Sequence, residues 1–496
     1  MAPKNLLVIM ADEHNPKMLG CAGHPLVKTP HLDALAKRGT RFNRAYTNCP
    51  ICVPARASFA TGRYVHDIGY WDNAIAYDGR VKSWGHRLQE AGIRVESIGK
   101  LHYRREEDPT GFDRQHLPMH IKDGIGMIHM SVRKQFPDFA PPPPKPGSGA
   151  AGIVLEAGPG ESEYTRYDRK VAELASDWLL DRADSEKPWA LFVSFVTPHY
   201  PLLAPEEFFK LYPIDAMPMP KLGHQTGFEH HPWFADILKV NLGADGSDEQ
   251  HKTAYAAYLG LCSFMDAMVG QVVDMLTSIG GLGRTRVIYT SDHGENAGAR
   301  GQWGKSNHYE EASGIPMIVA GAGAPVGKVS QTPVSLVDVY PTVVNWTDAE
   351  APDAAELPGR CLFEIANEED DPDRIAFSEY HASKSPSASF MIRKGRYKYI
   401  HYVGFEAELF DLESDPDEEH NLAADPLYVD VVRDYEAAMR AMIDPEEIDR
   451  QANAVQKEMI EKAGGPEQVF ANLVTTKSYT PVPDAIDAAL RGEGGE

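Results

Sequence analysis

A cysteine, a proline and an arginine stand at close spacing in Cys52-Val53-Pro54-Ala55-Arg56, and this segment is well suited to chemistry on an anion. A cysteine can act as a nucleophile, and an arginine can hold a sulfate or phosphate group. Thiol-dependent phosphatases place the arginine six residues after the cysteine, where this chain has Ser58, so the spacing excludes that mechanism. Cys49 and Cys52 also form a Cys-x-x-Cys pair, but no second pair stands at zinc-finger spacing. Two cysteines buried for packing are the remaining simple interpretation.

The composition limits the partners of the chain. It has 496 residues, 43% hydrophobic and 24% charged, which is a normal globular profile with room for more than one core. The formal net charge of −23 argues against a nucleic acid or an anionic membrane as partner. We expect no segment long and apolar enough to span a membrane. Five scattered cysteines and no recognisable signal peptide predict a cytoplasmic protein.

Strand-like and helix-like segments alternate along the first part of the chain. Continuous apolar runs at 5–10, 189–195 and 286–290 are typical of strands buried on both faces. Amphipathic segments at 30–39 and 164–181 predict helices between such strands. The pattern predicts an α/β fold with a mainly parallel central sheet flanked by helices.

The later part of the chain predicts smaller units. We expect a catalytic α/β domain over 1–370, a small C-terminal α+β domain over 371–474 with an antiparallel hairpin and a helix, and an arm over 475–496. Residues 104–162 show little periodicity and include four consecutive prolines. This segment is expected to cross the surface, either beside the mouth of the site or simply exposed to solvent.

Polar residues follow four of the predicted strands. Ligands of parallel α/β sheets bind beyond the carboxyl ends of the strands, so these residues are expected to meet at one rim. They are Asp12 and Glu13, Lys100 and His102, Thr197-Pro198-His199, and Asp292-His293-Gly294.

Together these segments resemble the type I, formylglycine-dependent sulfatases of the alkaline phosphatase superfamily. The resemblance rests on the 6–12 strand, Cys52 to Arg63, Gly99-Lys100-Leu101-His102, Thr197-Pro198-His199, Ser291-Asp292-His293-Gly294 and the 404–422 region, and it covers most of the chain. Tyr70-Trp71-Asp72-Asn73-Ala74 is similar to a segment of choline-sulfatase-like and phosphonate-monoester-hydrolase-like members. The resemblance implies an alkaline-phosphatase-like fold.

The resemblance also implies the cofactors. Cys52 would be oxidised by a formylglycine-generating enzyme to Cα-formylglycine, an aldehyde that becomes a geminal diol in water. One divalent metal ion, which could be manganese, calcium or zinc, would be bound by Asp12, Glu13, Asp292 and His293 together with the modified Cys52. The histidine nitrogen favours manganese or zinc over calcium. Glu13 stands where many sulfatases have a second aspartate, so its part in binding the metal is left open.

The remaining implied roles concern catalysis and substrate binding. Arg56 would orient the formylglycine, and Lys100 and Lys305 would bind sulfonyl oxygens and offset charge in the transition state. Asn73 would contact the bound ester.

Two histidines would handle protons in the reaction that the resemblance implies. His199 would bind the substrate and protonate the departing alcohol, and His102 would take the proton of the second hydroxyl of Cys52-derived formylglycine. The implied function is metal-dependent hydrolysis of sulfate monoesters, of the arylsulfatase type, through a covalent sulfo-enzyme intermediate.

Several alternatives keep part of this machinery. A phosphonate monoester or a phosphodiester has a similar tetrahedral, anionic centre, and the motif residues do not separate it from a sulfate ester. Choline sulfate would need an aromatic cage, to which Trp71, Tyr70 and Tyr103 could contribute. A sulfated-ligand binder that is never modified is a further hypothesis. The C-terminal arm would suit a homodimer or homotetramer and could complete the pocket of a neighbouring subunit.

Overall fold

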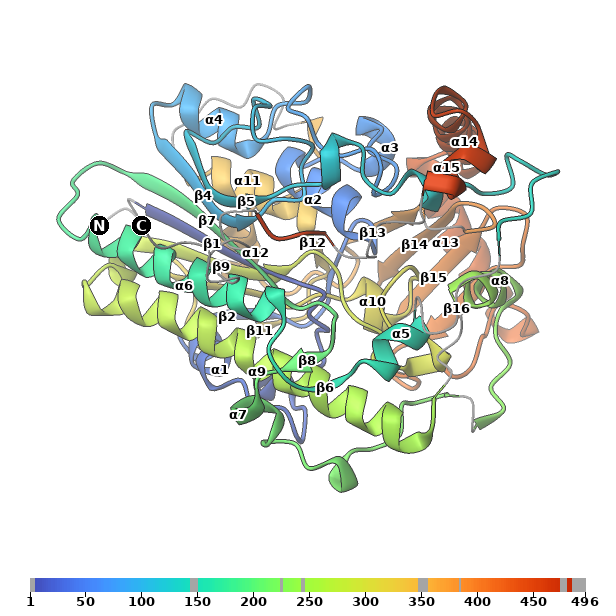
Figure 1. Ribbon diagram of the computed structural model, residues 1–496, viewed down its shortest axis with the longest axis horizontal. Coiled ribbons are helices and arrows are strands. Elements are labelled where there is room, and N and C mark those ends of the chain that lie inside the picture. The colour runs from blue at the N-terminus through green and yellow to red at the C-terminus, as the bar shows by residue number, and fades with distance from the viewer. Residues whose placement is uncertain are drawn as a thin grey trace.

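The computed structural model describes residues 5–142, 150–223, 226–241, 246–346, 356–382, 385–472 and 480–483. Figure 1 shows a large domain built around a central sheet and a smaller lobe that carries the C-terminal strands and helices. The predicted arm over 475–496 lies outside the described residues except for 480–483, and so do the last two residues of the proline run.

The central sheet is mainly parallel, as predicted. It has eight strands in the order β11-β2-β10-β9-β1-β7-β4-β5. Strand β10 runs antiparallel to both of its neighbours, and the other described strands of this sheet share one direction. The strands are β1 (Asn5–Asp12), β2 (Gly39–Phe42), β4 (Arg94–Lys100), β5 (Arg114–Met119), β7 (Trp189–Pro198), β9 (Thr285–Ser291), β10 (Met317–Gly321) and β11 (Lys328–Ser330).

Helices cover both faces of this sheet (Figure 1). One face carries α1 (Pro30–Lys37), α6 (Glu163–Leu180) and α9 (Asp248–Ser278), and the other carries α2 (Cys52–Thr61), α4 (Trp84–Glu90), α11 (Val339–Val344) and α12 (Leu362–Asn367). Successive side chains of a strand point to opposite faces. Leu7 and Ile9 of β1 accordingly pack with α6 and α9, whereas Leu6 and Val8 pack with α2 and α4. The double cover explains why the buried strands are apolar throughout.

Helix α9 corrects one prediction. By length and mean hydropathy it could cross a membrane, contrary to our expectation that no segment would. However, 89% of its most apolar window is buried inside the protein, where α9 packs against the sheet and alongside α6. It is the one described helix that passes the length and hydropathy test, and its burial identifies it as a core helix.

The C-terminal part forms a second, antiparallel sheet, with helices α13 (Val429–Met442), α14 (Pro445–Lys462) and α15 (Pro466–Ala471). Its strands follow chain order: β13 (Ala376–Tyr380), β14 (Ser389–Lys394), β15 (Tyr397–Tyr402) and β16 (Glu408–Asp411). The predicted hairpin is β14–β15, whose turn has Gly395 at φ 53°. The smaller C-terminal α+β unit is therefore confirmed, whereas its boundary at residue 370 stays a prediction.

Short elements complete the chain. The strands are β3 (Ala45–Tyr46), β6 (Gly158–Pro159), β8 (Leu203–Ala204) and β12 (Val334–Ser335). The helices are α3 (Val65–Ile68), α5 (Ala150–Leu155), α7 (Glu206–Phe209), α8 (Pro232–Asn241) and α10 (Glu310–Ser313).

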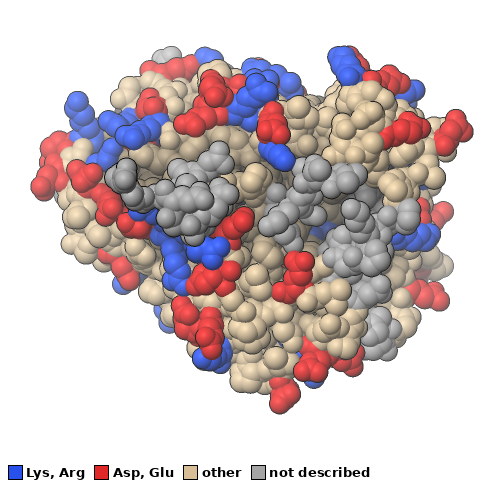
Figure 2. Space-filling model, in the orientation of Figure 1, with Lys and Arg blue, Asp and Glu red and all other residues tan. Residues whose placement is uncertain are grey.

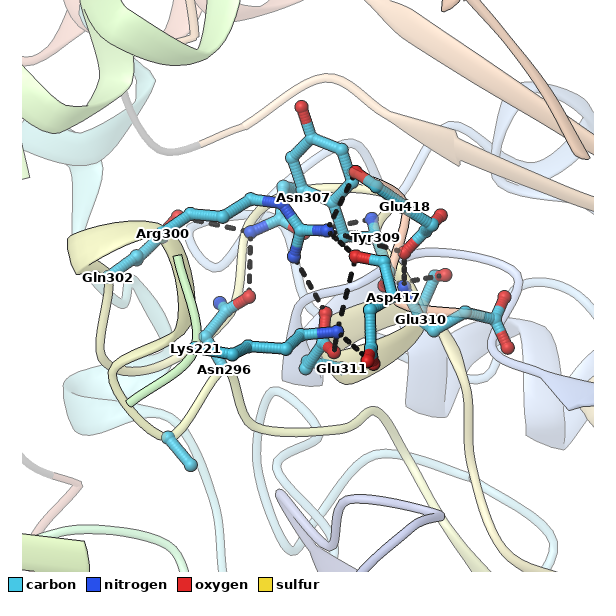
Figure 3. A network of polar contacts seen from close by, with 12 residues as sticks. Lys221, Asn296, Arg300, Gln302, Asn307, Tyr309, Glu310, Glu311, Asp417 and Glu418 are labelled. Carbon is cyan, nitrogen blue, oxygen red and sulfur yellow. Dashed lines mark hydrogen bonds and ion pairs between the residues drawn. The ribbon is translucent and has the colours of Figure 1, made fainter. Parts of the chain in front are cut away.

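A network of charged side chains, buried at its centre and partly exposed at Lys221 and Asp417, ties the second sheet to the segment around α10 (Figure 3). We call it the interdomain network, and it comprises Lys221, Arg300, Glu310, Glu311, Lys398, Asp417 and Glu418. Arg300, with 1% of its side chain exposed, lies 2.9 Å from Oε2 of Glu311 and donates to the backbone carbonyls of Asp417 and Glu418. Its guanidinium also lies 3.9 Å from the centre of the Tyr309 ring.

Candidate active site

Adjacent parallel strands deliver the acidic groups of the site. Strands β1 and β9 pair in parallel as far as Ala11 and Ser291, so Asp12 and Asp292 leave the sheet side by side. Both side chains are fully buried, and so is His293. We predicted that these residues would meet at the carboxyl ends of the strands. The parallel register of β1 and β9 brings them together there.

Helix α2 brings Cys52 to the same point. Cys52 is the first residue of α2, and all ten residues of this helix are buried. Its sulfur lies 3.1 Å from Nε2 of His293 and 3.7 Å from Oδ1 of Asp12. A helix N-terminus favours negative charge, because its backbone N–H groups point outward and its dipole is positive there. The helix ends at Gly62, whose φ of 67° and proximity to Tyr340 leave no room for a side chain.

Each of the two aspartates presents one oxygen to a cation and the other to the shared centre. Oδ2 of Asp292 accepts from Nε of Arg56 at 2.7 Å, and Oδ2 of Asp12 lies 3.2 Å from Arg56 and 2.5 Å from Lys100. The two Oδ1 atoms lie 3.7 and 3.8 Å from Nε2 of His293. Nδ1 of His293 bonds to the carbonyl of Gly294 at 2.9 Å, which directs the Nε2 lone pair to the same centre.

These groups fit a divalent cation. One ligand atom each from Asp12, Cys52, Asp292 and His293 can be chosen so that all four lie within 4.8 Å of one another. Two carboxylates and an imidazole form a donor set used for manganese and zinc. Arg56 is the side chain that holds both carboxylates in place from behind.

Burial and charge set the protonation of the centre. Burial would raise the pKa of Asp12, but Lys100, His199 and Arg56 outweigh it and hold the pKa well below its usual value. Burial raises the pKa of the Cys52 thiol to about 12, with a further contribution from Asp12. Reactive cysteines have a lowered pKa, so the unmodified thiol does not match that type of nucleophile.

Lys305 and His199 form a second group next to the centre. Nζ of Lys305 lies 2.9 Å from Nε2 of His199 and 2.8 Å from Oε2 of Glu13. Nδ1 of His199 donates to the carbonyl of Tyr200 at 2.6 Å, which leaves Nε2 as the acceptor for Lys305. Glu13 thus lies with Lys305 and His199, in a possible ligand group with Asp12, rather than with Cys52. Its part in metal binding stays a prediction.

The predicted substrate contacts differ in their exposure. Asn73, His199 and Lys305 are 6%, 8% and 8% exposed, whereas Lys100 is 1% exposed, as buried as the four clustered ligand residues. Oδ1 of Asn73 accepts from the backbone N–H of Val53, which fixes it beside the start of α2. His102 has a left-handed backbone with φ 58°, just after β4. Its pKa is lowered well below the usual value by burial and by the charges of Lys100 and Arg56.

Some residues that support the site were not predicted from the sequence. Asp168 of α6 accepts from the backbone N–H groups of Val196 and Thr197 at 2.9 and 2.7 Å, and this holds the end of β7 that leads to His199. Its position on the apolar side of an amphipathic helix was the available signal, because a carboxylate there needs a buried partner.

The turn that carries Asn73 is held by residues distant in sequence. Asp72 accepts from Oγ of Ser131 at 2.5 Å and from Nε2 of Gln456 at 2.8 Å, and Gly126 packs against Asn73. No spacing pattern indicated Ser131 or Gln456. Part of the 104–162 segment therefore lies beside the site, which was one of the two expectations for it.

The aromatic residues considered for a choline cage lie elsewhere. Tyr70 is fully buried, bonds to Asp78 and packs edge-on against Tyr77, which in turn packs against Tyr103. Trp71 packs edge-on against His381 in the core of the small domain. These rings fill cores, so they do not form a cage around a ligand.

Comparisons with known proteins show which proteins this chain resembles. The sulfatase family profile matches residues 4–349, and a profile described as "N-sulphoglucosamine sulphohydrolase, C-terminal" matches residues 298–444. Choline-sulfatase of Rhizobium meliloti (strain 1021) is 31% identical over 85% of this chain and 83% of its own length. Arylsulfatase K of Bos taurus is 27% identical over 98% and 91%. The phosphonate monoester hydrolase SpPMH from Silicibacter pomeroyi superposes with a TM-score of 0.70 at 23% identity, over 88% of this chain and 95% of that one.

Proposed function

Because the chain belongs to the sulfatase family and is a sulfuric ester hydrolase, we propose that it hydrolyses small sulfate monoesters of the arylsulfatase type with a formylglycine made from Cys52. One observation carries the proposal. The side chain of Cys52 lies at the start of α2 within reach of both His293 and Asp12, so a group there meets the metal-binding residues and the helix N-terminus together. The thiol would be converted by a formylglycine-generating enzyme, which is the maturation partner in this proposal.

The metal centre of the proposal consists of Asp12, Asp292 and His293 with the modified Cys52. When bound, a divalent cation supplies Lewis acidity and lowers the pKa of a hydroxyl beside it. Manganese and zinc suit the imidazole nitrogen better than calcium does. Arg56 keeps the two carboxylates in the orientation that points their Oδ1 atoms to the centre.

Positive charge inside the site would bind the anionic ester. Arg56, Lys100 and Lys305 are each 8% exposed or less, so their charges act where little water screens them. On the face shown in Figure 2, acidic and basic side chains are interspersed, and the chain as a whole carries −23. Binding of a sulfate group is therefore assigned to the buried cations and not to a basic surface.

Departure of the alcohol would use the Lys305–His199 pair. In the 2.9 Å hydrogen bond between the two side chains, Nζ of Lys305 donates a proton to Nε2 of His199. The carbonyl of Tyr200 holds the ring from the other side, so Nε2 cannot turn away. The leaving oxygen can take this proton by way of His199 as its bond to sulfur breaks.

A phosphonate monoester or phosphodiester is the nearest rival substrate. Its phosphorus centre has the same tetrahedral shape and the same need for a cationic site. The likeness to the phosphonate monoester hydrolase supports the fold, and it does not decide between the two centres. Choline sulfate is less well supported, since the aromatic residues considered for its ammonium group lie in cores.

The test has two parts. The protein is produced with a formylglycine-generating enzyme, and the tryptic peptide 45–56 is examined by mass spectrometry for an aldehyde at Cys52. Turnover of p-nitrophenyl sulfate is then compared with that of a phenyl phosphonate monoester, with Cys52→Ala as the inactive control. An aldehyde with preferred sulfate turnover supports the proposal. Preferred phosphonate turnover selects the rival. A metal-loaded protein that keeps the Cys52 thiol and turns over neither ester favours the binding protein.

The setting and the assembly are proposals of the same kind. We propose a cytoplasmic enzyme, in keeping with the five free cysteines, and a homodimer or homotetramer. Light scattering on the full-length protein would check the assembly.

A further inference from the structure

Residues 480–483 lie against the candidate active site, far from the helix that precedes them. Figure 1 draws this segment in dark red across the large domain, whereas α15, which ends at Ala471, lies at the edge of the small lobe. The side chain of Val482 is 6% exposed and belongs to the same hydrophobic core as α6 and β7. The segment is therefore packed into the large domain and does not simply touch it.

Two hydrogen bonds fix Thr480 in this position. Its carbonyl accepts from the hydroxyl of Tyr164 at 2.8 Å, and its own hydroxyl lies 2.8 Å from Nε2 of His102. The ring of Tyr164 meets the ring of His199 edge-on, with 6.0 Å between centres. Thr480 thus contacts His102 directly and is linked to His199 through Tyr164. These are the two histidines that would move protons in the proposed reaction.

The bond to Thr480 determines which nitrogen of His102 is left for the reaction. Burial and neighbouring cations lower the pKa of His102, so the ring is neutral at pH 7 and carries one proton. Nδ1 is buried and has no hydrogen-bond partner among the described residues. A threonine hydroxyl can accept or donate, so it can take the Nε2–H of His102 as an acceptor. Nδ1 then keeps the lone pair that a base requires.

We propose that Thr480 is a positioning residue for His102, because its hydroxyl accepts the Nε2–H and holds Nδ1 as the proton acceptor. The inference rests on the proposed function, in which His102 acts after the alcohol has left. In that step the second hydroxyl of the Cys52-derived group loses its proton to Nδ1. Its electron pair forms the carbonyl, and sulfate leaves with the electrons of the broken carbon–oxygen bond. Throughout this step Thr480 keeps accepting from Nε2.

This role makes a specific kinetic prediction. With p-nitrophenyl sulfate, kcat/KM reports events up to the departure of nitrophenol, whereas kcat also includes the later step. Thr480→Val keeps the shape and removes the hydroxyl, and it should lower kcat roughly tenfold while kcat/KM stays within about twofold. Thr480→Ser restores the hydroxyl and should keep kcat within about threefold of the parent enzyme. A burst of nitrophenol before slow turnover should appear only in Thr480→Val.

A second measurement does not depend on activity. The full-length protein is labelled with ¹⁵N-histidine, and the ring signals of His102 are identified by their loss in His102→Gln. The parent protein and Thr480→Ser should show a single tautomer with the proton on Nε2. Thr480→Val should show a mixture of tautomers or the opposite one.

The outcomes separate the inference from the proposed function. Unchanged kinetics in Thr480→Val, or an equal fall of kcat and kcat/KM in both variants, would overturn the positioning role. If the parent enzyme hydrolyses no ester, the proposed function fails, and the NMR experiment then decides alone. In that case an unchanged His102 signal in Thr480→Val would overturn the inference.

Discussion

The candidate active site and the buried centre of the interdomain network are both clusters of acidic and basic side chains, but their charges are arranged differently. In the network, each of the four carboxylates has a lysine or arginine within ion-pair distance, and signs alternate from one group to the next. In the site, Asp12 and Asp292 turn one oxygen each towards the same point, together with Cys52 and His293. The cations Arg56 and Lys100 contact the opposite oxygens, the Oδ2 atoms, of these two carboxylates.

The difference teaches how to distinguish a structural cluster from a functional one. In a network with alternating signs, each charge is compensated by a neighbouring side chain, so no further ion is needed. A cluster whose like-charged oxygens converge is satisfied only when a cation comes between them. Four predictions test this contrast.

Cys52 should be required for turnover, although it is a small buried side chain. Cys52→Ala should lower kcat with p-nitrophenyl sulfate by roughly 10⁴-fold or more, because it removes the nucleophile and not only a contact. Cys49→Ala is the matched control and should keep activity within about threefold, since Cys49 is buried in a hydrophobic cluster that the large domain shares with the second sheet. Equal losses in the two variants would instead favour a redox pair.

Arg300 should be needed for stability and not for chemistry. Arg300→Met leaves the buried carboxylate of Glu311 with one cation fewer, and urea denaturation should show a loss of about 3–5 kcal/mol in unfolding free energy. Its kcat per folded molecule should be unchanged. Arg440→Met is the control, because Arg440 is 40% exposed in its pair with Glu446 and should cost less than about 1 kcal/mol.

A divalent cation should stabilise the protein through the site and not through the network. Manganese at about 100 times its dissociation constant should add about 2.7 kcal/mol to the unfolding free energy, seen as a higher melting temperature. Asp292→Asn should abolish this increase, whereas Glu311→Gln should lower the starting stability and keep the increase. An increase that survives Asp292→Asn would place the ion elsewhere.

Acid should weaken the network in part through Glu311. Burial would raise its pKa, but Lys221 and Arg300 hold the pKa well below its usual value. A lowered folded-state pKa gives stability that is present above the unfolded value and is lost as pH falls below it. One such group contributes at most about 1.4 kcal/mol per pH unit. Denaturation curves from about pH 6 to about pH 3 should therefore be flatter for Glu311→Gln, and an unchanged slope would contradict the prediction.

Much of the main domain could be predicted because its signals are local. The apolar runs that became β1, β7 and β9 lie in a sheet covered on both faces, and period and length identify such strands. The strands β13 and β2 were not predicted, because short strands carry too few residues for a pattern. The antiparallel direction of β10 could not be predicted, since strand direction depends on the path of the chain between strands.

The site residues also divide into those with a local sequence signal and those placed by long-range packing. Asp12, Lys100, His199 and Asp292 could be proposed because a parallel sheet brings the ends of its strands to one edge. Thr480 could not, since its contact with His102 spans 378 residues and depends on how the segment after α15 packs. The same holds for the interdomain network, whose charged side chains come from the short helix α10, from strand β15 and from other segments that are far apart in the sequence.

Helix α2 is buried along its whole length, so in the folded protein another macromolecule cannot reach the side chain of Cys52. Under the proposed function, an oxidising enzyme must meet this segment while the chain is still open. The active fraction of any preparation is then set by the rate of oxidation of Cys52 relative to the rate of folding. Molecules that fold first would remain inert, however much of the maturation enzyme is added later.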